Sequence, residues 1–196
     1  MIRSFYRKIG FGIGLGEEVP SDPLKWAQDQ LDNVAPFTWE GNIPTEKEMR
    51  KKYGEWIYGD RKVLRKKYKN DKTKYRSEKN KLRNKTGERF FESNELTIRH
   101  NEAVKGNSPV FERFWHFWGN HFAISDKDFL AAFSTGPYQR EIIRPNMVST
   151  FEQMVKDVTT SWCMIHHLDN SESVGPLSKW GVQSRETINE NHAREL

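Results

Sequence analysis

Two histidines lie in the aromatic-rich stretch FERFWHFWGNHF, which covers residues 111–122. Histidine is the commonest metal ligand and acid–base group, so this pair raises the question of a metal or catalytic site. Each helical residue turns by ~100°, so the five-residue spacing points His116 and His121 about 140° apart. Two zinc ligands on one helix need a spacing of four residues so that both rings converge. The spacing therefore argues against joint chelation by these two side chains.

The same angular count sorts the other side chains of this helix. Five aromatic side chains share one face, namely Phe111, Phe114, Trp115, Trp118 and Phe122. His116 and Asn120 fall on the opposite face, and His121 falls at the margin of the aromatic face. We therefore predict an aromatic core helix with His116 exposed and His121 half-buried. The alternative is that His121, beside Asn120, supplies a polar group to a site that another helix completes.

A second polar stretch, LDNSESVGP, covers residues 168–176 and follows an apolar helical segment. Asp169, Asn170 and Ser173 are its candidate site residues. Asp and Asn at a helix end often bond only to nearby backbone groups. The alternative is an oxygen-rich cation site or a contact to a polar substrate. The spacing does not match a D-x-D-x-D-G calcium loop, so the residues do not identify a metal.

A third polar stretch, NENHAREL, covers residues 189–196. Glu190 and Arg194 stand four apart, which is the spacing of an intrahelical ion pair, and so do Asn191 and Glu195. An N-capped helix with such pairs is one interpretation. The other is that Glu190 and Glu195 are acid, base or ligand groups of a site, positioned by Asn191 and Arg194.

Arg144 lies in a fourth stretch, REIIRP, where Pro145 ends the predicted helix. A guanidinium can bind a carboxylate or phosphate through two parallel hydrogen bonds. Arg144 is therefore a candidate ligand-binding residue, or else a structural partner of Asp169 or Glu195.

Helices must position these four stretches. Apolar spacing and cap residues predict a helix over 21–34, a very polar helical stretch over 45–85, and a helix over 88–104. Further helices are predicted over 127–134, 138–144 and 149–168, with loops at 35–46 and 170–183 and a last helix from about residue 189. No hairpin pattern is present. The predicted fold class is all-α and bundle-like.

Charge is unevenly distributed along the chain, because residues 61–85 contain 13 Lys and Arg but only 2 acidic residues. A basic helix can bind nucleic acid or an anionic membrane surface, and it can equally be a solvated face. The apolar stripe in this segment is narrow, so nucleic-acid binding is kept only as an alternative function.

Several classes of protein are excluded by simple features. The single cysteine, Cys163, rules out an internal disulfide framework and a cysteine-based zinc site. No apolar run approaches the ~20 residues that cross a bilayer, and the first residues lack a signal-peptide pattern. The glycine-rich turn GFGIGLG at 10–16 does not fit G-x-G-x-x-G, so a dinucleotide site is not predicted.

The four motifs together resemble the bacterial domain-of-unknown-function family 1800. FERFWHFWGNHFAIS is similar to its E-R-x-x-x-F-W-x-N-H-F-x-x-S signature, and GPYQREIIRPNMVSTFEQM, HHLDNSESVGP and NENHAREL follow in the family's order. GFGIGLG and DPLKWAQDQL are similar to its N-terminal turn and helix. Some members carry His at the position of Gly119, and His192 stands at a variable position and is a poor site candidate.

The resemblance implies more than the residues do. It implies that residues 1–196 are the N-terminal part of one larger helical domain whose C-terminal half would be a partner, with a helix at 21–34, a charged region at 45–104 and a motif-bearing region at 109–196. It also implies a sulfatase-like partner protein and an envelope location. It implies no reaction, metal or cofactor.

Our leading hypothesis is that the motifs converge on one polar or metal-assisted pocket floored by the aromatic helix. His121, Asp169, Glu190 and Glu195 would be its acid, base or ligand groups, and its positioning residues would be Asn120, Arg144, Asn170, Ser173, Asn191 and Arg194. The competing hypothesis is a non-enzymatic envelope or export-accessory protein in which these residues form a structural network.

Overall fold

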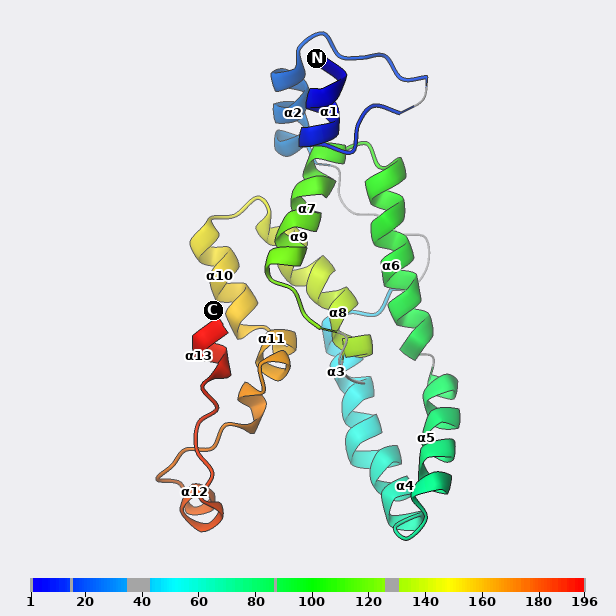
Figure 1. The fold of residues 1–196 in the computed structure, drawn as a ribbon, viewed down its shortest axis with the longest axis vertical. Coiled ribbons are helices and arrows are strands. Elements are labelled where there is room, and N and C mark those ends of the chain that lie inside the picture. Colours follow the sequence, from blue (N-terminus) through cyan, green and yellow to red (C-terminus); the bar gives the residue numbers. More distant parts are fainter. Residues whose placement is uncertain (1, 15, 35–42, 87, 126–130, 196) are drawn as a thin grey trace.

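The structure is a computed structural model that describes residues 2–14, 16–34, 43–86, 88–125 and 131–195. The described residues form helices and connecting segments and contain no strand, so the predicted all-α class is confirmed. The molecule is elongated, with the N-terminal helices at one end and a helical hairpin at the other (Figure 1).

The N-terminal end consists of α1 (Ile2–Ile9) and α2 (Pro23–Asp32). The predicted start of the second helix is confirmed, because the Asp22 carboxylate accepts hydrogen bonds from the backbone N–H groups of Leu24 at 3.1 Å and Lys25 at 3.0 Å. Tyr6 is buried, packs edge-to-face on Trp26 at 4.8 Å between ring centroids, and donates to the Pro20 carbonyl at 2.6 Å. The two helices therefore form a small aromatic unit.

The charged region is divided into more elements than its composition indicates. It comprises α3 (Glu46–Gly54), the π-helix η1 (Glu55–Asp60), α4 (Arg61–Lys67), α5 (Lys72–Thr86) and α6 (Glu88–Lys105). The prediction of one unbroken polar helical stretch over 45–85 was wrong at Tyr68–Asp71. The Asp71 carboxylate accepts from the Lys74 N–H at 2.8 Å and so caps a new helix. The basic residues therefore lie on a hairpin at one end of the molecule (Figure 1).

The centre of the molecule is built from α6, α7 (Pro109–His121) and the continuous rod of α8 (Ala131–Pro137), the π-helix η2 (Tyr138–Ile143) and α9 (Arg144–Asn146). α8 packs against both α3 and α6, and α7 packs against α6 and η2. Residues 106–108 separate α6 from α7, and Pro109 occupies the first turn of α7.

The C-terminal part comprises α10 (Phe151–Thr160), α11 (Trp162–His167), the 3₁₀ turn η3 (Asn170–Glu172), α12 (Lys179–Ser184) and α13 (Asn191–Glu195). The predicted helix over 149–168 is split, because the Ser161 hydroxyl accepts from the Met164 N–H and starts a second helix. The loop predicted over 170–183 contains the short helix α12. Part of the loop predicted over 35–46 and of the helix predicted over 127–134 lies outside the described residues.

A cluster of buried side chains joins α7, η2, α10 and α11. Its members are Trp115, Tyr138, Ile143, Met154, Val158, Cys163, Met164 and Leu168. Trp115 Nε1 donates to the Gln139 carbonyl at 3.1 Å and Tyr138 Oη donates to the Phe122 carbonyl at 3.0 Å, so both aromatic polar atoms are satisfied. This cluster fixes α7 against η2.

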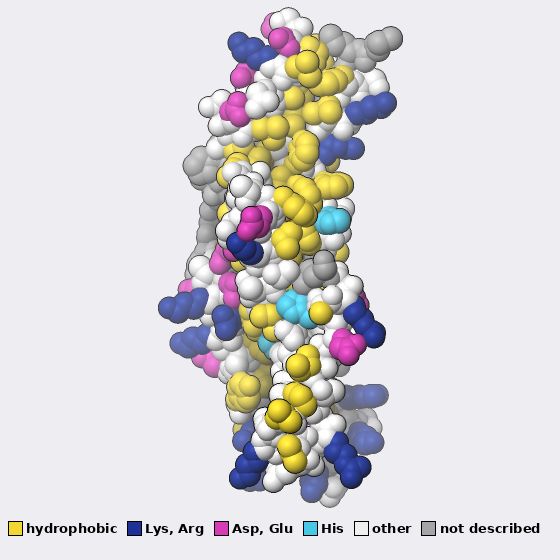
Figure 2. Space-filling model, turned by 90° about the vertical axis from the view of Figure 1, so that its left-hand side faces the viewer, with side chains coloured by type: hydrophobic (Ala, Val, Ile, Leu, Met, Phe, Trp, Pro, Cys, Tyr) yellow, Lys and Arg dark blue, Asp and Glu magenta, His cyan; other side chains and the backbone are white. Residues whose placement is uncertain are grey.

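Hydrophobic side chains also reach the surface. Figure 2 shows a broken band of them along most of the length of one face. No helix in the described part of the chain has the length and apolar character needed to cross a membrane.

Candidate functional site

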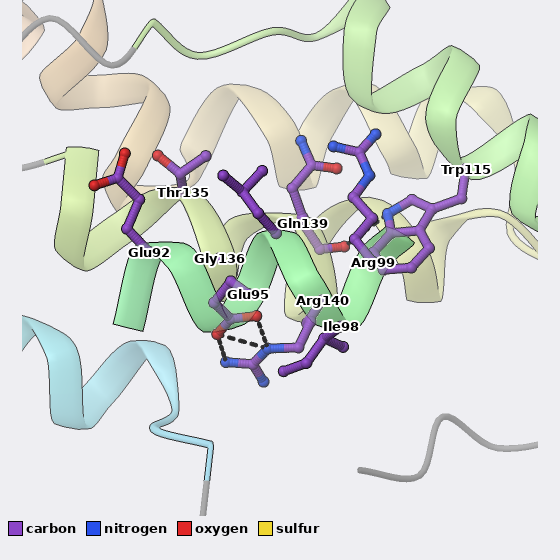
Figure 3. A pocket seen from close by; sticks show the side chains of 10 residues that line it. Glu92, Glu95, Ile98, Arg99, Trp115, Thr135, Gly136, Gln139 and Arg140 are labelled. Atoms are coloured by element: carbon purple, nitrogen blue, oxygen red, sulfur yellow. Dashed lines mark hydrogen bonds and ion pairs between the residues drawn. The ribbon is translucent and has the colours of Figure 1, made fainter. Parts of the chain in front are cut away.

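A cavity of about 230 Å³ lies where α6 meets α7, α8 and η2 (Figure 3). It is the candidate site because charged side chains of α6 and η2 meet apolar walls there. Its lining residues are Glu92, Glu95, Leu96, Ile98, Arg99, Trp115, Thr135, Gly136, Gln139 and Arg140.

One cation of the cavity, Arg140, is fully paired. Its Nε donates to Glu95 Oε2 at 2.8 Å and Oε1 at 3.0 Å, and its Nη2 donates to Oε1 at 2.8 Å. Nη2 also donates to the Pro44 carbonyl at 2.7 Å, which ties the segment before α3 to the same pair. Both side chains are largely buried, with 12% of Arg140 and 13% of Glu95 exposed. This two-point geometry is the strong form of a carboxylate–guanidinium contact.

A second buried cation, Arg144, lies directly behind the cavity wall. It contacts Glu112 at 2.6 Å, and only 1% of the Glu112 side chain is exposed. Burial raises the pKa of the Glu112 carboxyl, and the charge of Arg144 opposes that shift. The Arg144 guanidinium stacks over Trp115 at 4.7 Å and Phe111 at 4.8 Å. Asp169 and Glu195 were the structural partners predicted for Arg144, and Glu112 was not among them.

The third cation, Arg99, has no anion of its own. No hydrogen bond or ion pair joins it to the residues that the structure describes, and its Nε and Nη2 atoms are buried. Its guanidinium lies 5.5 Å from the centre of the Trp115 ring. Burial lowers the pKa of Arg99, and the nearby charge of Glu112 opposes that shift. Among the described residues, Arg99 is therefore a largely buried charge stabilised only by an aromatic ring and a distant carboxylate.

A polar acceptor lies next to Arg99. Gln139 Nε2 donates to the Gly119 carbonyl at 3.4 Å, and Gln139 Oε1 is buried without a hydrogen-bond partner. A Cβ at Gly119 would collide with Gln139 Oε1 and would lie 2.7 Å from Arg99 Nη2. Glycine at this position thus leaves room for the polar ends of both side chains, and Figure 3 shows them on the same side of α6.

The predicted histidine exposure was wrong for both rings of α7. His121 is exposed at the end of the helix, stacked on Phe117 with the ring centroids 6.2 Å apart, and Asn120 beside it is also exposed. His116 is the half-buried ring, and its Nε2 atom is buried. The prediction assumed that only the aromatic face of α7 packs against the rest of the protein. The face that carries His116 packs against α6, and Phe11 packs edge-to-face on His116.

Two of the predicted polar stretches do meet. Ser173 Oγ donates to Asn170 Oδ1 at 2.9 Å and accepts from the Asn189 N–H at 3.0 Å. Asn170 Nδ2 lies 3.0 Å from His192 Nδ1, so the stretches at 168–176 and 189–196 are joined side chain to side chain. Asp169 adopts a left-handed backbone conformation between α11 and η3, with φ at 57°. His192, dismissed as a site candidate, is part of this network.

The remaining candidate acids lie on the surface. Glu190 and Arg194 form the predicted ion pair at 3.1 Å with 70% and 72% of their side chains exposed, and Glu195 is exposed. The Asn191 N–H donates to Asn189 Oδ1 at 3.0 Å at the start of α13. Among the described residues no three His, Cys, Asp or Glu side chains gather as a metal site. The common site for His121, Asp169, Glu190 and Glu195 stays a prediction.

A sequence model of the family described as "Protein of unknown function (DUF1800)" matches residues 4–196. The chain belongs to the DUF1800 family. No curated protein matches the chain, and no solved structure matches it. Since membership in DUF1800 defines neither a reaction nor a ligand, a function has to be argued from the geometry of the cavity.

The sequence analysis of this DUF1800 chain did not single out Glu95, Arg99 or Gln139. Glu95 and Arg99 stand four apart on α6, which is the spacing of an ordinary intrahelical pair. The structure instead pairs Glu95 with Arg140, 45 residues away in sequence. One feature of the sequence could have pointed to such a pair. The motif REIIRP contains two arginines, Arg140 and Arg144, but only one carboxylate, so at least one arginine needs a carboxylate from another part of the chain.

Proposed function

We propose that the chain is a binding domain for a small organic anion, held in the cavity by Arg99. The observation that carries the proposal is the unpaired, largely buried guanidinium in the cavity wall. Removing a charge from water costs several kcal/mol unless a counter-charge compensates. Arg140 and Arg144 have carboxylate partners, whereas Arg99 has none among the described residues. A carboxylate or phosphate ligand would supply the missing counter-charge.

The size and walls of the cavity narrow the class of ligand. A volume of about 230 Å³ is below the ~300–1,000 Å³ of pockets that hold drug-sized molecules. Leu96, Ile98 and Trp115 provide apolar walls, so they favour an anion with a short hydrocarbon or planar body. Gln139 Oε1 is an unused acceptor and would pair with a hydroxyl or amine donor of the ligand. We therefore favour a small hydroxy or amino carboxylate, or a small phosphate ester.

The proposed anion site lies at a different place from the pocket predicted from the sequence motifs, although two of those motifs contribute to it. Trp115 and Gly119 belong to the aromatic motif, and Gln139 and Arg140 belong to the QREIIRP motif. A polar or metal-assisted pocket at His121, Asp169, Glu190 and Glu195 is a separate, finer hypothesis. The polar network of Asn170, Ser173 and His192 supports a structural role for that region at least as well.

Two alternatives compete with anion binding. A non-enzymatic envelope or export-accessory role needs no occupied cavity, so it predicts that ligands leave the protein's stability unchanged. Nucleic-acid binding would use the exposed basic residues of α4 and α5, and its affinity would fall steeply with added salt.

The test is thermal unfolding and calorimetry with lactate, malonate, glycerol phosphate and inorganic phosphate. A ligand at one hundred times its Kd stabilises the native state by about 2.7 kcal/mol. In Arg99→Met the response to the best ligand should disappear, while stability without ligand should stay equal or rise because an unpaired buried charge is gone. Arg76→Met is the matched control, since Arg76 is an exposed arginine of α5.

Gly119→Ala gives an independent check that keeps the charge. The new Cβ displaces Gln139 Oε1 and Arg99 Nη2, so binding should weaken although the charge of Arg99 is retained. Failure of the whole panel to stabilise the wild type, or an unchanged response in Arg99→Met, would overturn the proposal.

A further inference from the structure

We propose a second site, in which His100 and His116 together bind one divalent transition-metal ion. The site lies beyond the anion cavity, where α6 and α7 meet the glycine-rich segment at residues 11–14. A cavity of about 590 Å³ opens there, and its lining includes Phe11, Gly12, Glu17, His100, Lys105 and His116. The two imidazoles come from different helices, so the proposal does not depend on spacing within one helix.

The first ligand, His100, is held in the form that binds metals. Its Nδ1 lies 2.8 Å from the Leu96 carbonyl oxygen. A carbonyl only accepts, so Nδ1 carries the proton and Nε2 presents its lone pair. Metal-binding histidines commonly donate their other ring N–H to a backbone carbonyl in this way, which fixes the ring orientation.

The second ligand, His116, has a ring nitrogen with nothing to bond. Its Nε2 is buried and has no hydrogen-bond partner among the described residues. A ring nitrogen without a hydrogen-bond partner can present its lone pair to a metal ion.

The separation of the two rings suits a shared ion. Their centroids are 6.3 Å apart and their planes are tilted by 40°. With metal–nitrogen bonds of ~2.1 Å, two imidazole centroids lie roughly 5.2 Å apart at a tetrahedral angle and roughly 6.4 Å apart when the ligands are opposed. The observed separation lies inside that range, near its opposed end, so the distance between the rings is compatible with one shared ion.

The remaining ligands define the strength and selectivity of the site. Water would fill the other positions, and Glu17 lines the same cavity, although its carboxylate accepts from the Gly14 N–H at 2.9 Å. The positive charges of Arg99 and Lys105 oppose a dication. A site with two nitrogen ligands and water should therefore be of moderate affinity and should prefer Cu²⁺ over Ni²⁺ and Zn²⁺.

The test is titration of the full chain with Cu²⁺, Ni²⁺ and Zn²⁺ by calorimetry, with electron paramagnetic resonance of the Cu²⁺ form. We expect one site with hyperfine coupling to two nitrogens. His100→Gln and His116→Gln should each weaken binding at least tenfold, while Arg76→Met, which alters an exposed side chain of α5 outside this cavity, should leave it unchanged. Because His100 is exposed, His100→Gln should fold as the wild type does. A loss of metal binding in this variant therefore reports on the ligand and not on misfolding. Absence of binding, or unchanged binding in His100→Gln, would refute the site.

Discussion

The two faces of α7 each contain an exception to the usual rule that apolar side chains are buried and polar side chains are exposed. The face towards α6 and η2 buries Glu112, and it carries the half-buried His116 and the close approach at Gly119. The opposite face exposes 42% of Phe114 and 57% of Phe117, with the exposed His121 beside them. A carboxylate is thus enclosed beside the buried rings of Phe111 and Trp115, while two other aromatic rings meet solvent. Buried polar groups and exposed apolar patches are the informative exceptions to ordinary packing, and α7 has both.

The contrast indicates that the interior face is specialised. Each buried charge there needs a partner, an aromatic ring or a ligand, and those requirements fix the positions of α6 and η2. The exposed side chains of the exterior face do not need buried partners. Changes on the two faces should therefore differ strongly in their effect on stability.

The largest effect is expected at the buried ion pair of the interior face. Glu112→Ala leaves the Arg144 charge buried without its 2.6 Å partner, and breaking such a pair costs about 3–5 kcal/mol. Urea unfolding followed by tryptophan fluorescence measures the loss. The double variant Glu112→Leu with Arg144→Met should recover much of it. A loss below about 1 kcal/mol in Glu112→Ala would show that water replaces the pair.

A smaller effect, dependent on pH, is expected at His116. The folded-state pKa is lowered to about 4 from an ordinary value of 6.5, so protons bind preferentially to the unfolded chain between these values. The His116 contribution to stability should be complete above pH 6.5 and decline as the pH falls towards 4. Comparing wild type with His116→Gln across this range isolates that contribution. A stability difference that does not change with pH would contradict it.

The smallest effects are expected on the exterior face. His121→Ala and Phe117→Ser each remove an exposed ring, and surface substitutions usually change stability by less than about 0.5 kcal/mol. Urea unfolding measures these changes too, and the loss of stability in Glu112→Ala is the value with which they are compared. A loss above about 1 kcal/mol at either position would mean that the exterior face is covered, for example in an assembly.

The sequence predicts the elements with clear caps much better than it predicts their packing. Asp22 with Pro23, and Ser108 with Pro109, mark helix starts that the structure contains. The turn at Tyr68–Asp71 was missed because polar, helix-favouring residues continue on both sides of it. Both π-helices were also missed, since a single wide turn leaves no mark in hydrophobic spacing.

The candidate site was only half predictable. The motifs correctly drew attention to the aromatic helix and to REIIRP, but the side chains that meet there include Arg99 and Glu95 from a polar helix of ordinary appearance. Which carboxylate pairs with which arginine depends on how α6 and η2 pack, and that is a property of the tertiary structure. The histidine exposures were reversed for the same reason, because α7 has neighbours on two sides.

The wide turn η2 has a consequence for how this segment can change in length. The Arg144 N–H donates to the Gln139 carbonyl five residues back, so one residue more than an α-turn separates the two. Deleting one of residues 141–143 would restore a regular helix but rotate Arg144 by about 100° relative to Arg140. The pairs with Glu95 and Glu112 could then not both form. Relatives shortened by one residue here are expected to lack one of these two carboxylates.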